Sequence, residues 1–340
     1  MFSKIYNVIK KYIQENLKTI IIYGIILFMI LCPVNYYIIT GGGSFNALDK
    51  VIIKNAYKSK GSFNMAYVSE IKGTVFTYLL SYVIPSYERD SIDDYRANDD
   101  EDVKDIDFRN RLWLKQTNNN AIYVAYTNAN KEIKEKYKRN YIFNIDEKAK
   151  TNLKVGDQIL EMDGIKLDSI DDLKKYVNSK NALDKVIFKV KRNGKICEKY
   201  AIIYENDSKL YVGVTLLEDT EYITDPKVKF NFKSSESGPS GGLIMSLQIY
   251  NLITKWDITN GLKIVGTGTI NKDGSVGSID GVKYKLNGAV KNRADVFLVP
   301  NGKNYSEALK EKKKNNYNIK IIGVNDFNDA LNKLKNLKNK

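Results

Sequence analysis

Residues 228–253 read VKFNFKSSESGPSGGLIMSLQIYNLI, which describes a strand, a tight turn and an apolar helix. Val228–Phe232 alternates apolar and polar residues, as half-buried strands do, whereas Leu243–Ile253 has the apolar content of a helix. Three glycines and a proline surround Ser240 in the turn between them. A serine at such a junction is exposed, and the backbone N–H groups at the helix start are free to bind an oxyanion. Taken alone, the turn favours the interpretation as an ordinary Gly-Pro-Ser turn without chemistry.

The chain has 340 residues and no histidine, so a Ser-His-Asp triad is impossible. A serine hydroxyl is a poor nucleophile until a base takes its proton. Lys285, 45 positions after Ser240 in the sequence DGVKYKL, is a candidate base. A free lysine has a pKa of about 10.4, and burial can lower that value by about three units. We therefore expect Lys285 to be buried beneath Val282 and Leu286; a solvated helix lysine is the alternative.

Further motifs follow the serine turn in a fixed order. Gly266-Thr267-Gly268-Thr269 ends a predicted strand, Asp280–Leu286 begins a predicted helix, and Val299-Pro300 lies in the next strand. Over about residues 210–340, these motifs resemble the proteolytic domain of the Lon family of Ser/Lys peptidases. Lys283, two residues before Lys285, does not fall at the lysine position of that family.

The resemblance implies a role for each matching residue. Ser240 is the nucleophile, Lys285 accepts its proton, and Thr267 orients the amine. The backbone around Gly238 and Gly241 is the oxyanion-hole region. The sequence departs from the family pattern at three places: Ser237 replaces the usual acidic residue, Gly241 replaces alanine, and Asp280 replaces the first glycine of the lysine motif.

Residues 135–205 have a different pattern. Leu153–Gly164 reads as turn, strand and turn, and Ser169–Asn178 as a helix with Ser169 at its N-cap. Val186–Lys195 reads as a strand that ends in an Asn-Gly hairpin turn. This order resembles a PDZ domain and implies binding of an extended peptide at a sheet edge. The carboxylate-binding loop of that family should lie near Tyr137–Ile142, which lacks the glycine-rich pattern, so a positioning role is equally open.

The N-terminal residues predict a membrane anchor. Thr19–Thr40 is uncharged and apolar and is long enough to cross a bilayer as one helix. The lysines that precede it favour a cytoplasmic N-terminus, with Tyr36 and Tyr37 at the outer interface. Residues 1–18 are then a cytoplasmic basic segment, whose apolar stripe could lie on the inner membrane surface. A cleaved signal peptide is the alternative.

The predicted fold class is a multidomain α+β protein. Its parts are an N-terminal transmembrane helix (19–40), an extracytoplasmic region of unclear fold (41–134), a PDZ-like β domain (135–205) and a Lon-type α/β proteolytic domain (206–340), in which strand and helix patterns alternate. Within the unclear region, Val51–Ile53 and Gly73–Tyr78 favour strands, and Asn118–Glu135 favours a helix.

Composition limits the partners and cofactors. The net charge is +14, but the basic residues are mostly scattered lysines, so we expect no nucleic-acid partner. The chain has two cysteines far apart and no Gly-x-x-x-x-Gly-Lys-[Ser/Thr] motif, and we expect no metal, cofactor or ATPase module. The sequence therefore predicts an ATP-independent, membrane-anchored serine endopeptidase with protein or peptide substrates; the family's ring assembly makes a homo-oligomer possible. The alternatives are an inactive membrane-tethered peptide-binding scaffold and, from charge alone, a polyanion binder.

Overall fold

The computed structural model describes residues 2–98, 101–167 and 169–337. The chain divides into two compact units, which we describe separately. The N-terminal unit consists of Met1–Gly41 and Ser69–Tyr95, and the main unit of Gly42–Val68 and Arg96–Lys340. The strands β1 (Pro33–Asn46) and β3 (Ser62–Thr74) each run from one unit into the other along the chain.

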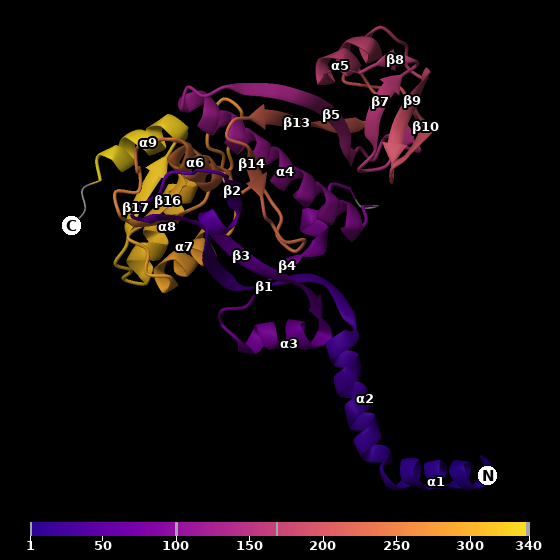
Figure 1. Ribbon diagram of the computed structural model, residues 1–340. Coiled ribbons are helices and arrows are strands. Elements are labelled where there is room, and N and C mark those ends of the chain that lie inside the picture. Colours follow the sequence, from indigo (N-terminus) through magenta and orange to yellow (C-terminus); the bar gives the residue numbers. More distant parts are fainter. Residues whose placement is uncertain (1, 99–100, 168, 338–340) are drawn as a thin grey trace. The chain divides into compact units, whose positions relative to one another are not determined.

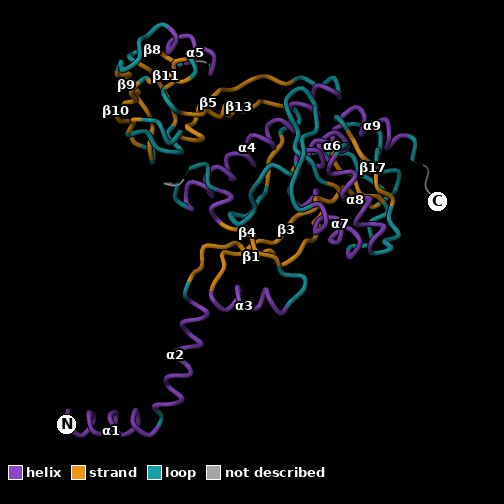
Figure 2. Tube along the Cα trace, turned by 180° about the vertical axis from the view of Figure 1, so that it is seen from behind, coloured by secondary structure: helices purple, strands orange, loops and turns teal. Residues whose placement is uncertain are grey.

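The N-terminal unit combines helices with a short antiparallel pair of strands (Figure 2). Helix α1 (Phe2–Glu15) is followed by α2 (Leu17–Leu31), and α3 (Val75–Val83) follows β3. Strand β4 (Glu88–Ser91) pairs antiparallel with the first part of β1, and the 3-10 turn η2 (Ile92–Tyr95) closes the unit.

The apolar N-terminal helix ends earlier than predicted. Helix α2 stops at Leu31, Cys32 is extended, and the residues from Pro33 to Thr40 belong to β1. The cause is Pro33, because the ring of a proline disfavours helical backbone at the residue before it. Tyr37, expected at a membrane interface, is a buried strand residue opposite Asp90. No single described helix is long and apolar enough to span a membrane, but α1 and α2, bent by 77°, pass that test as a pair.

The predicted strand at Gly73–Tyr78 is also wrong. Strand β3 ends at Thr74, which is the N-cap of α3 and exchanges hydrogen bonds with Thr77 in a capping box. The β-branched and aromatic residues of this stretch favour a strand by propensity, and the cap determines the helix instead.

The main unit contains a parallel sheet with helices on both faces. Its strands stand in the order β17 (Lys320–Val324), β16 (Val296–Pro300), β15 (Lys263–Gly266) and β3, all parallel. One face packs against α6 (Gly242–Ile253) and α9 (Phe327–Lys335), and α4 (Val103–Asn128) packs in turn against α6. The other face packs against α7 (Val282–Lys291) and α8 (Lys303–Lys314). Strand β16, which is buried at every residue, is apolar throughout, as expected for a parallel strand covered on both faces.

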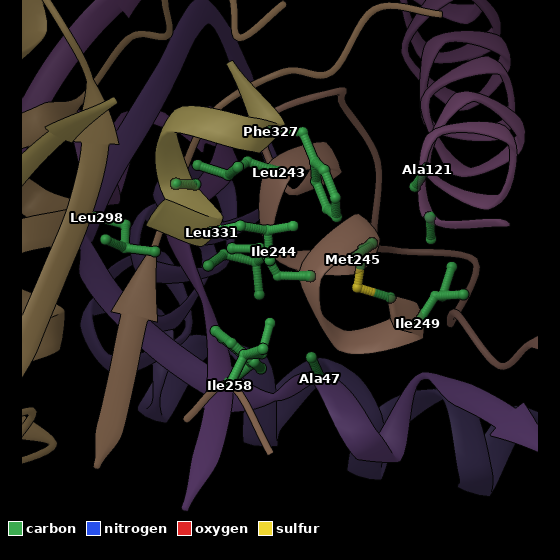
Figure 3. Close-up of a cluster of buried hydrophobic side chains, with 14 of the residues drawn as sticks. Ala47, Ala121, Leu243, Ile244, Met245, Ile249, Ile258, Leu298, Phe327 and Leu331 are labelled. Carbon is green, nitrogen blue, oxygen red and sulfur yellow. The ribbon is translucent and has the colours of Figure 1, made fainter. Parts of the chain in front are cut away.

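Helix α6 lies at the centre of the larger core. Figure 3 shows its apolar residues surrounded by side chains from several other elements. The labelled contributors are Leu243, Ile244, Met245 and Ile249 of α6, Ala121 of α4, Leu298 of β16, Phe327 and Leu331 of α9, Ile258, and Ala47 of the 3-10 turn η1 (Ala47–Asp49). Residues 47–66 and 103–128, whose fold the sequence leaves open, thus belong to the core that holds residues 242–337. Strand β2 (Val51–Ile53) contributes as well, since it pairs with β14 (Val228–Phe230), the strand before the serine turn.

A second sheet is built from residues 133–224 and has its own core. Its strands stand in the order β13, β5, β7, β9, β10 and β6, with β8 beside β7. Their bounds are β5 (Ile133–Ile145), β6 (Lys150–Thr151), β7 (Gln158–Met162), β8 (Ile165–Lys166), β9 (Lys185–Arg192), β10 (Lys195–Ile202) and β13 (Val214–Thr224), and β11 (Tyr204–Asn206) pairs separately with β12 (Lys209–Tyr211). The predicted hairpin turn at Asn193-Gly194 joins β9 to β10, and the predicted N-cap Ser169 begins α5 (Ile170–Asn178). The long pair β5–β13 joins this sheet along the chain to α4 and β14 (Figure 1).

The remaining predicted elements of the C-terminal half are confirmed within a few residues. Helices α6 and α7 and strands β14 and β16 lie where the sequence predicts them. The structure is therefore mixed α/β, with an antiparallel sheet and an α/β core, and the single N-terminal transmembrane helix of the predicted fold class is not shown.

Candidate active site

Ser240 lies in the turn between β14 and α6, two residues before the helix begins. Gly238 has φ +88°, which only glycine adopts without strain, and its N–H donates to the Asn110 carbonyl of α4 at 3.0 Å. The helix start is fixed in turn, because Leu243 N donates to the Gly268 carbonyl at 3.0 Å. Ser240 itself is half-buried. A rigid backbone therefore holds this serine in a partly exposed position.

Thr267 contacts the serine turn directly. Its hydroxyl Oγ1 donates to the backbone carbonyl of Ser240 at 3.0 Å, and Gly268 N donates to the same oxygen at 2.7 Å. Thr267 is fully buried at the end of β15. The structure thus brings Ser240 and Thr267 together, through the serine backbone. The hydroxyl proton of Thr267 is used in this bond, and the lone pairs of its oxygen remain for a donor such as an amine.

Lys285 is in the first turn of α7, which starts after Gly281 in the left-handed conformation. Its side chain is 5% exposed, in agreement with the burial expected from the sequence. The ammonium nitrogen Nζ donates to the backbone carbonyl of Asp280 at 2.9 Å. Burial penalises the charged form of an amine. The pairing of this nitrogen with Ser240 Oγ stays a prediction.

A lysine that the sequence did not single out fixes the other side of the turn. Lys50 is 8% exposed, and its Nζ contacts both carboxylate oxygens of Glu236 at 2.7 and 2.9 Å. The same nitrogen lies 5.0 Å from the ring centre of Phe45 and 5.7 Å from that of Phe232. Glu236 also accepts from Lys233 N, so one ion pair closes the loop before Ser240. No local motif marks Lys50, and its partner is 186 residues away.

The glycine that replaces the alanine of the Lon pattern has a structural reason. A Cβ built on Gly241 would lie 1.8 Å from Sδ of Met65, a β3 residue that is 9% exposed. A Cβ on Gly242 would lie 2.5 Å from Thr117 of α4. The turn is therefore packed closely against residues of the segment before the PDZ-like sheet.

The hydrogen bonds also narrow the oxyanion-hole prediction. The N–H of Gly238 already donates to Asn110, so it cannot hold a substrate oxygen without breaking that bond. Gly241, the other residue named from the sequence, is the N-cap of α6. The positive end of a helix dipole favours negative charge at such a position.

The stretch expected to form a carboxylate-binding loop is a strand. Tyr137–Ile142 belongs to β5, where Asn140 and Tyr141 pair with β13 on one side and with β7 on the other. Both edges of the backbone are occupied at these two residues, so a peptide cannot add a strand there.

Comparisons with known proteins find two family matches along the chain. The family model of the PDZ domain matches residues 114–199, and that of the Lon protease (S16) C-terminal proteolytic domain matches residues 233–336. A comparison with curated proteins gives no match.

Several solved PDZ domains are similar to part of the chain. The PDZ domain of the SdrC-like protein from Listeria monocytogenes is 23% identical, covers 23% of this chain and 86% of its own, and gives a TM-score of 0.22. The corresponding domain from Listeria innocua is 25% identical, covers 22% of this chain and 90% of its own, and gives a TM-score of 0.21.

Proposed function

We propose that this chain, which combines a PDZ domain with a Lon-type proteolytic domain, is an ATP-independent serine endopeptidase anchored in a membrane. The Lon-type domain supports the class, a serine protease. The finer assignment is a Ser240–Lys285 dyad that cleaves proteins or peptides on the outer side of the membrane. The burial of a lysine at the lysine position of the Lon pattern carries this assignment. A lysine acts as a general base only while its amine is uncharged, and burial penalises the charged form.

The proposed reaction has two stages. Ser240 Oγ attacks the peptide carbonyl carbon while Lys285 takes its proton, and the Gly241 N–H stabilises the oxyanion. The C–N bond then breaks, Lys285 gives the proton to the leaving amine, and an acyl ester remains on Ser240. Water attacks this ester with Lys285 again as the base, which releases the acid and restores the serine.

The hydrogen bonds to the backbone of the Ser240 turn support a role for Thr267 as a positioning residue. Its hydroxyl and the N–H of Gly268 both bind the Ser240 carbonyl, which fixes the backbone from which Oγ projects. Rigid placement of a nucleophile lowers the entropic part of the barrier. We assign Thr267 to this function and to orientation of the Lys285 amine.

The test uses the full chain in lipid nanodiscs with an unstructured protein as substrate. Ser240→Ala and Lys285→Ala should each abolish cleavage without changing the circular dichroism spectrum. Lys283→Ala removes a lysine from the same turn of α7 and should cleave like the parent. A fluorophosphonate probe should label the parent at Ser240 and not label Ser240→Ala. If Ser240→Ala and Lys285→Ala cleave as well as the parent, the proposal is wrong; if the parent itself neither cleaves nor reacts with the probe, the chain is a peptide-binding scaffold.

A further inference from the structure

Helix α3 has an apolar face that no described element covers. Its sequence, Val75–Val83, contains no charged residue. Phe76, Leu79, Tyr82 and Val83 are 42%, 51%, 64% and 77% exposed. The spacing of 76, 79 and 83 puts these side chains on one side of the helix. Ser81, on another side, is buried and donates back to the Tyr78 carbonyl.

The position of α3 within the N-terminal unit indicates what covers this face. Val75 N, at the start of α3, donates to the carbonyl of Cys32 at 3.0 Å, directly after α2 ends. Figures 1 and 2 both show α3 lying crosswise at that end of α2. If α2 crosses a bilayer, α3 is held where α2 leaves the hydrocarbon and runs along the membrane plane.

The side chains around α3 fit an interface between lipid and water. Tyr36, Tyr78 and Tyr82 form a chain of ring contacts with centroid distances of 5.0 and 5.5 Å. The guanidinium of Arg89 lies 3.8 Å from the ring centre of Tyr82, and Arg89 also donates to Ser81 Oγ. Tyrosine rings are enriched at the headgroup level of membranes, and arginine side chains reach from there toward water.

The length of α2 gives an independent reason. Its 15 residues rise about 22 Å, which is less than the hydrocarbon core of about 30 Å. A short span is accommodated by bilayer thinning and by flanking residues that sit in the interface. Helix α1 has an apolar stripe of exposed residues at the other end of α2, and the two helices meet at 77°. Helix α2 alone is too short to cross the hydrocarbon core. Interfacial helices at its two ends, α1 and α3, would compensate for the missing length.

We propose that α3 is an interfacial helix, which rests with its Phe76, Leu79, Tyr82 and Val83 face in the headgroup region of the outer leaflet. The occupant of this surface is phospholipid. This inference rests on the membrane anchor of the proposed function and is independent of the catalytic assignment. The end of β3 and the start of β4 flank α3 in the chain. If α3 lies in the headgroup region, both strand ends lie next to the membrane surface.

The experiment places one nitroxide label at a time on the full chain in phosphatidylcholine nanodiscs, in a Cys32→Ser/Cys197→Ser background. The labelled variants are Leu79→Cys and Val83→Cys on α3, Leu27→Cys on α2, and Ile196→Cys on β10 as an exposed control (62% exposed in the parent). Collisions with oxygen, which concentrates in lipid, are compared with collisions with a water-soluble nickel complex. We expect the oxygen-to-nickel ratio at 79 and 83 to be several-fold above that at 196 and below that at 27.

Each other outcome overturns the inference in a distinguishable way. If the label at 27 is in lipid but those at 79 and 83 match the control, α3 is in water and the inference is wrong while the anchor stands. If labels at 83 broaden one another in undiluted samples and are shielded from oxygen, a second copy covers the face instead. If the label at 27 is itself in water, the proposed membrane anchor is wrong, and the proposed interfacial position of α3 is wrong as well.

Discussion

Two lysines, Lys50 and Lys285, are buried in the part of the chain that the structure describes. They differ in how far the sequence alone predicts their function. Lys285 belongs to a motif that resembles a known active site, whereas Lys50 belongs to a region without any motif. Lys50 contacts both oxygens of a carboxylate, and Lys285 donates to a peptide carbonyl. A carboxylate partner favours the charged form of an amine, which a base cannot use. Burial alone therefore does not identify a catalytic lysine; its partner has to be known as well.

Lys285→Met tests the catalytic side of this comparison and should give the largest effect. General-base catalysis contributes about 10²–10⁴-fold to a rate, so we expect cleavage to fall by at least that factor. The methionine fills the space of the alkyl chain and removes a buried amine, so the urea midpoint should change little. Cleavage rates and urea unfolding, measured on the same preparation, separate the two quantities. A variant that unfolds much earlier than the parent would make Lys285 a structural residue.

Lys50→Met tests the other side and should destabilise the chain. The substitution leaves the Glu236 carboxylate without its partner, and the side chain of Glu236 is 24% exposed. Breaking a fully buried pair costs about 3–5 kcal/mol, so with partial exposure we expect about 2–3 kcal/mol. The loss of activity should follow the loss of folded protein and disappear when rates are corrected for it.

The control for Lys50→Met is a substitution of Glu236, the partner of Lys50 in the ion pair. Glu236→Gln alone leaves the ammonium buried, but Lys50→Met with Glu236→Gln removes both charges. The double variant should recover most of the stability lost in Lys50→Met, as expected for two residues in direct contact. Purely additive losses would mean that the ion pair does not fix the loop before Ser240.

The same contrast explains which parts of the fold could be predicted. Helices α6 and α7 and strand β16 follow from local patterns, and the Ser240 turn follows from its glycines. Lys50, Asn110 and Met65 contact that turn across 128 to 186 residues of sequence, and no periodicity marks such contacts. The helix of Thr19–Thr40 was predicted from length and hydropathy without the effect of Pro33 on Cys32. Strand propensity misled at Val75–Tyr78 because a Thr74 capping box decides that segment.

Gly241→Ala tests whether Met65, which belongs to a region without any recognisable motif, fixes the conformation of the Ser240 turn. The new methyl group would collide with Sδ of Met65, and the core around that side chain resists a shift. We expect a loss of about 1–2 kcal/mol in the free energy of unfolding, and a lower cleavage rate because the Ser240 turn moves. In the double variant with Met65→Ala, the losses should be clearly less than additive. Full additivity would show that Met65 moves aside freely and does not restrict residue 241.

Asp257 is a half-buried carboxylate in the loop that contacts Lys60, and its substitution should give the smallest effect. Partial burial opposes its ionisation, but hydrogen bonds from the Thr259 hydroxyl, the backbone N–H groups of Lys60 and Thr259 and the hydroxyl of Ser59 outweigh burial and lower its pKa. A carboxyl group whose pKa is lower in the folded state stabilises the fold above its unfolded value of about 3.9. That contribution is lost as the pH falls through the lower folded value. The loop before β3 is therefore held best near neutral pH.

Asp257→Asn should cost about 1 kcal/mol at pH 7, because an amide nitrogen cannot accept the hydrogen bond from Lys60 N. At strongly acidic pH the parent carboxyl is protonated as well, so the difference between the two proteins should disappear. Urea unfolding, followed by the fluorescence of the adjacent Trp256, measures this difference at both pH values. An equal difference at neutral and acidic pH would mean that the charge of Asp257 does not matter and that only its shape does. The loss in the free energy of unfolding for Asp257→Asn can be compared with the loss for Lys50→Met. The difference measures how much more the buried ion pair stabilises the fold than a hydrogen-bonded carboxylate nearer the surface does.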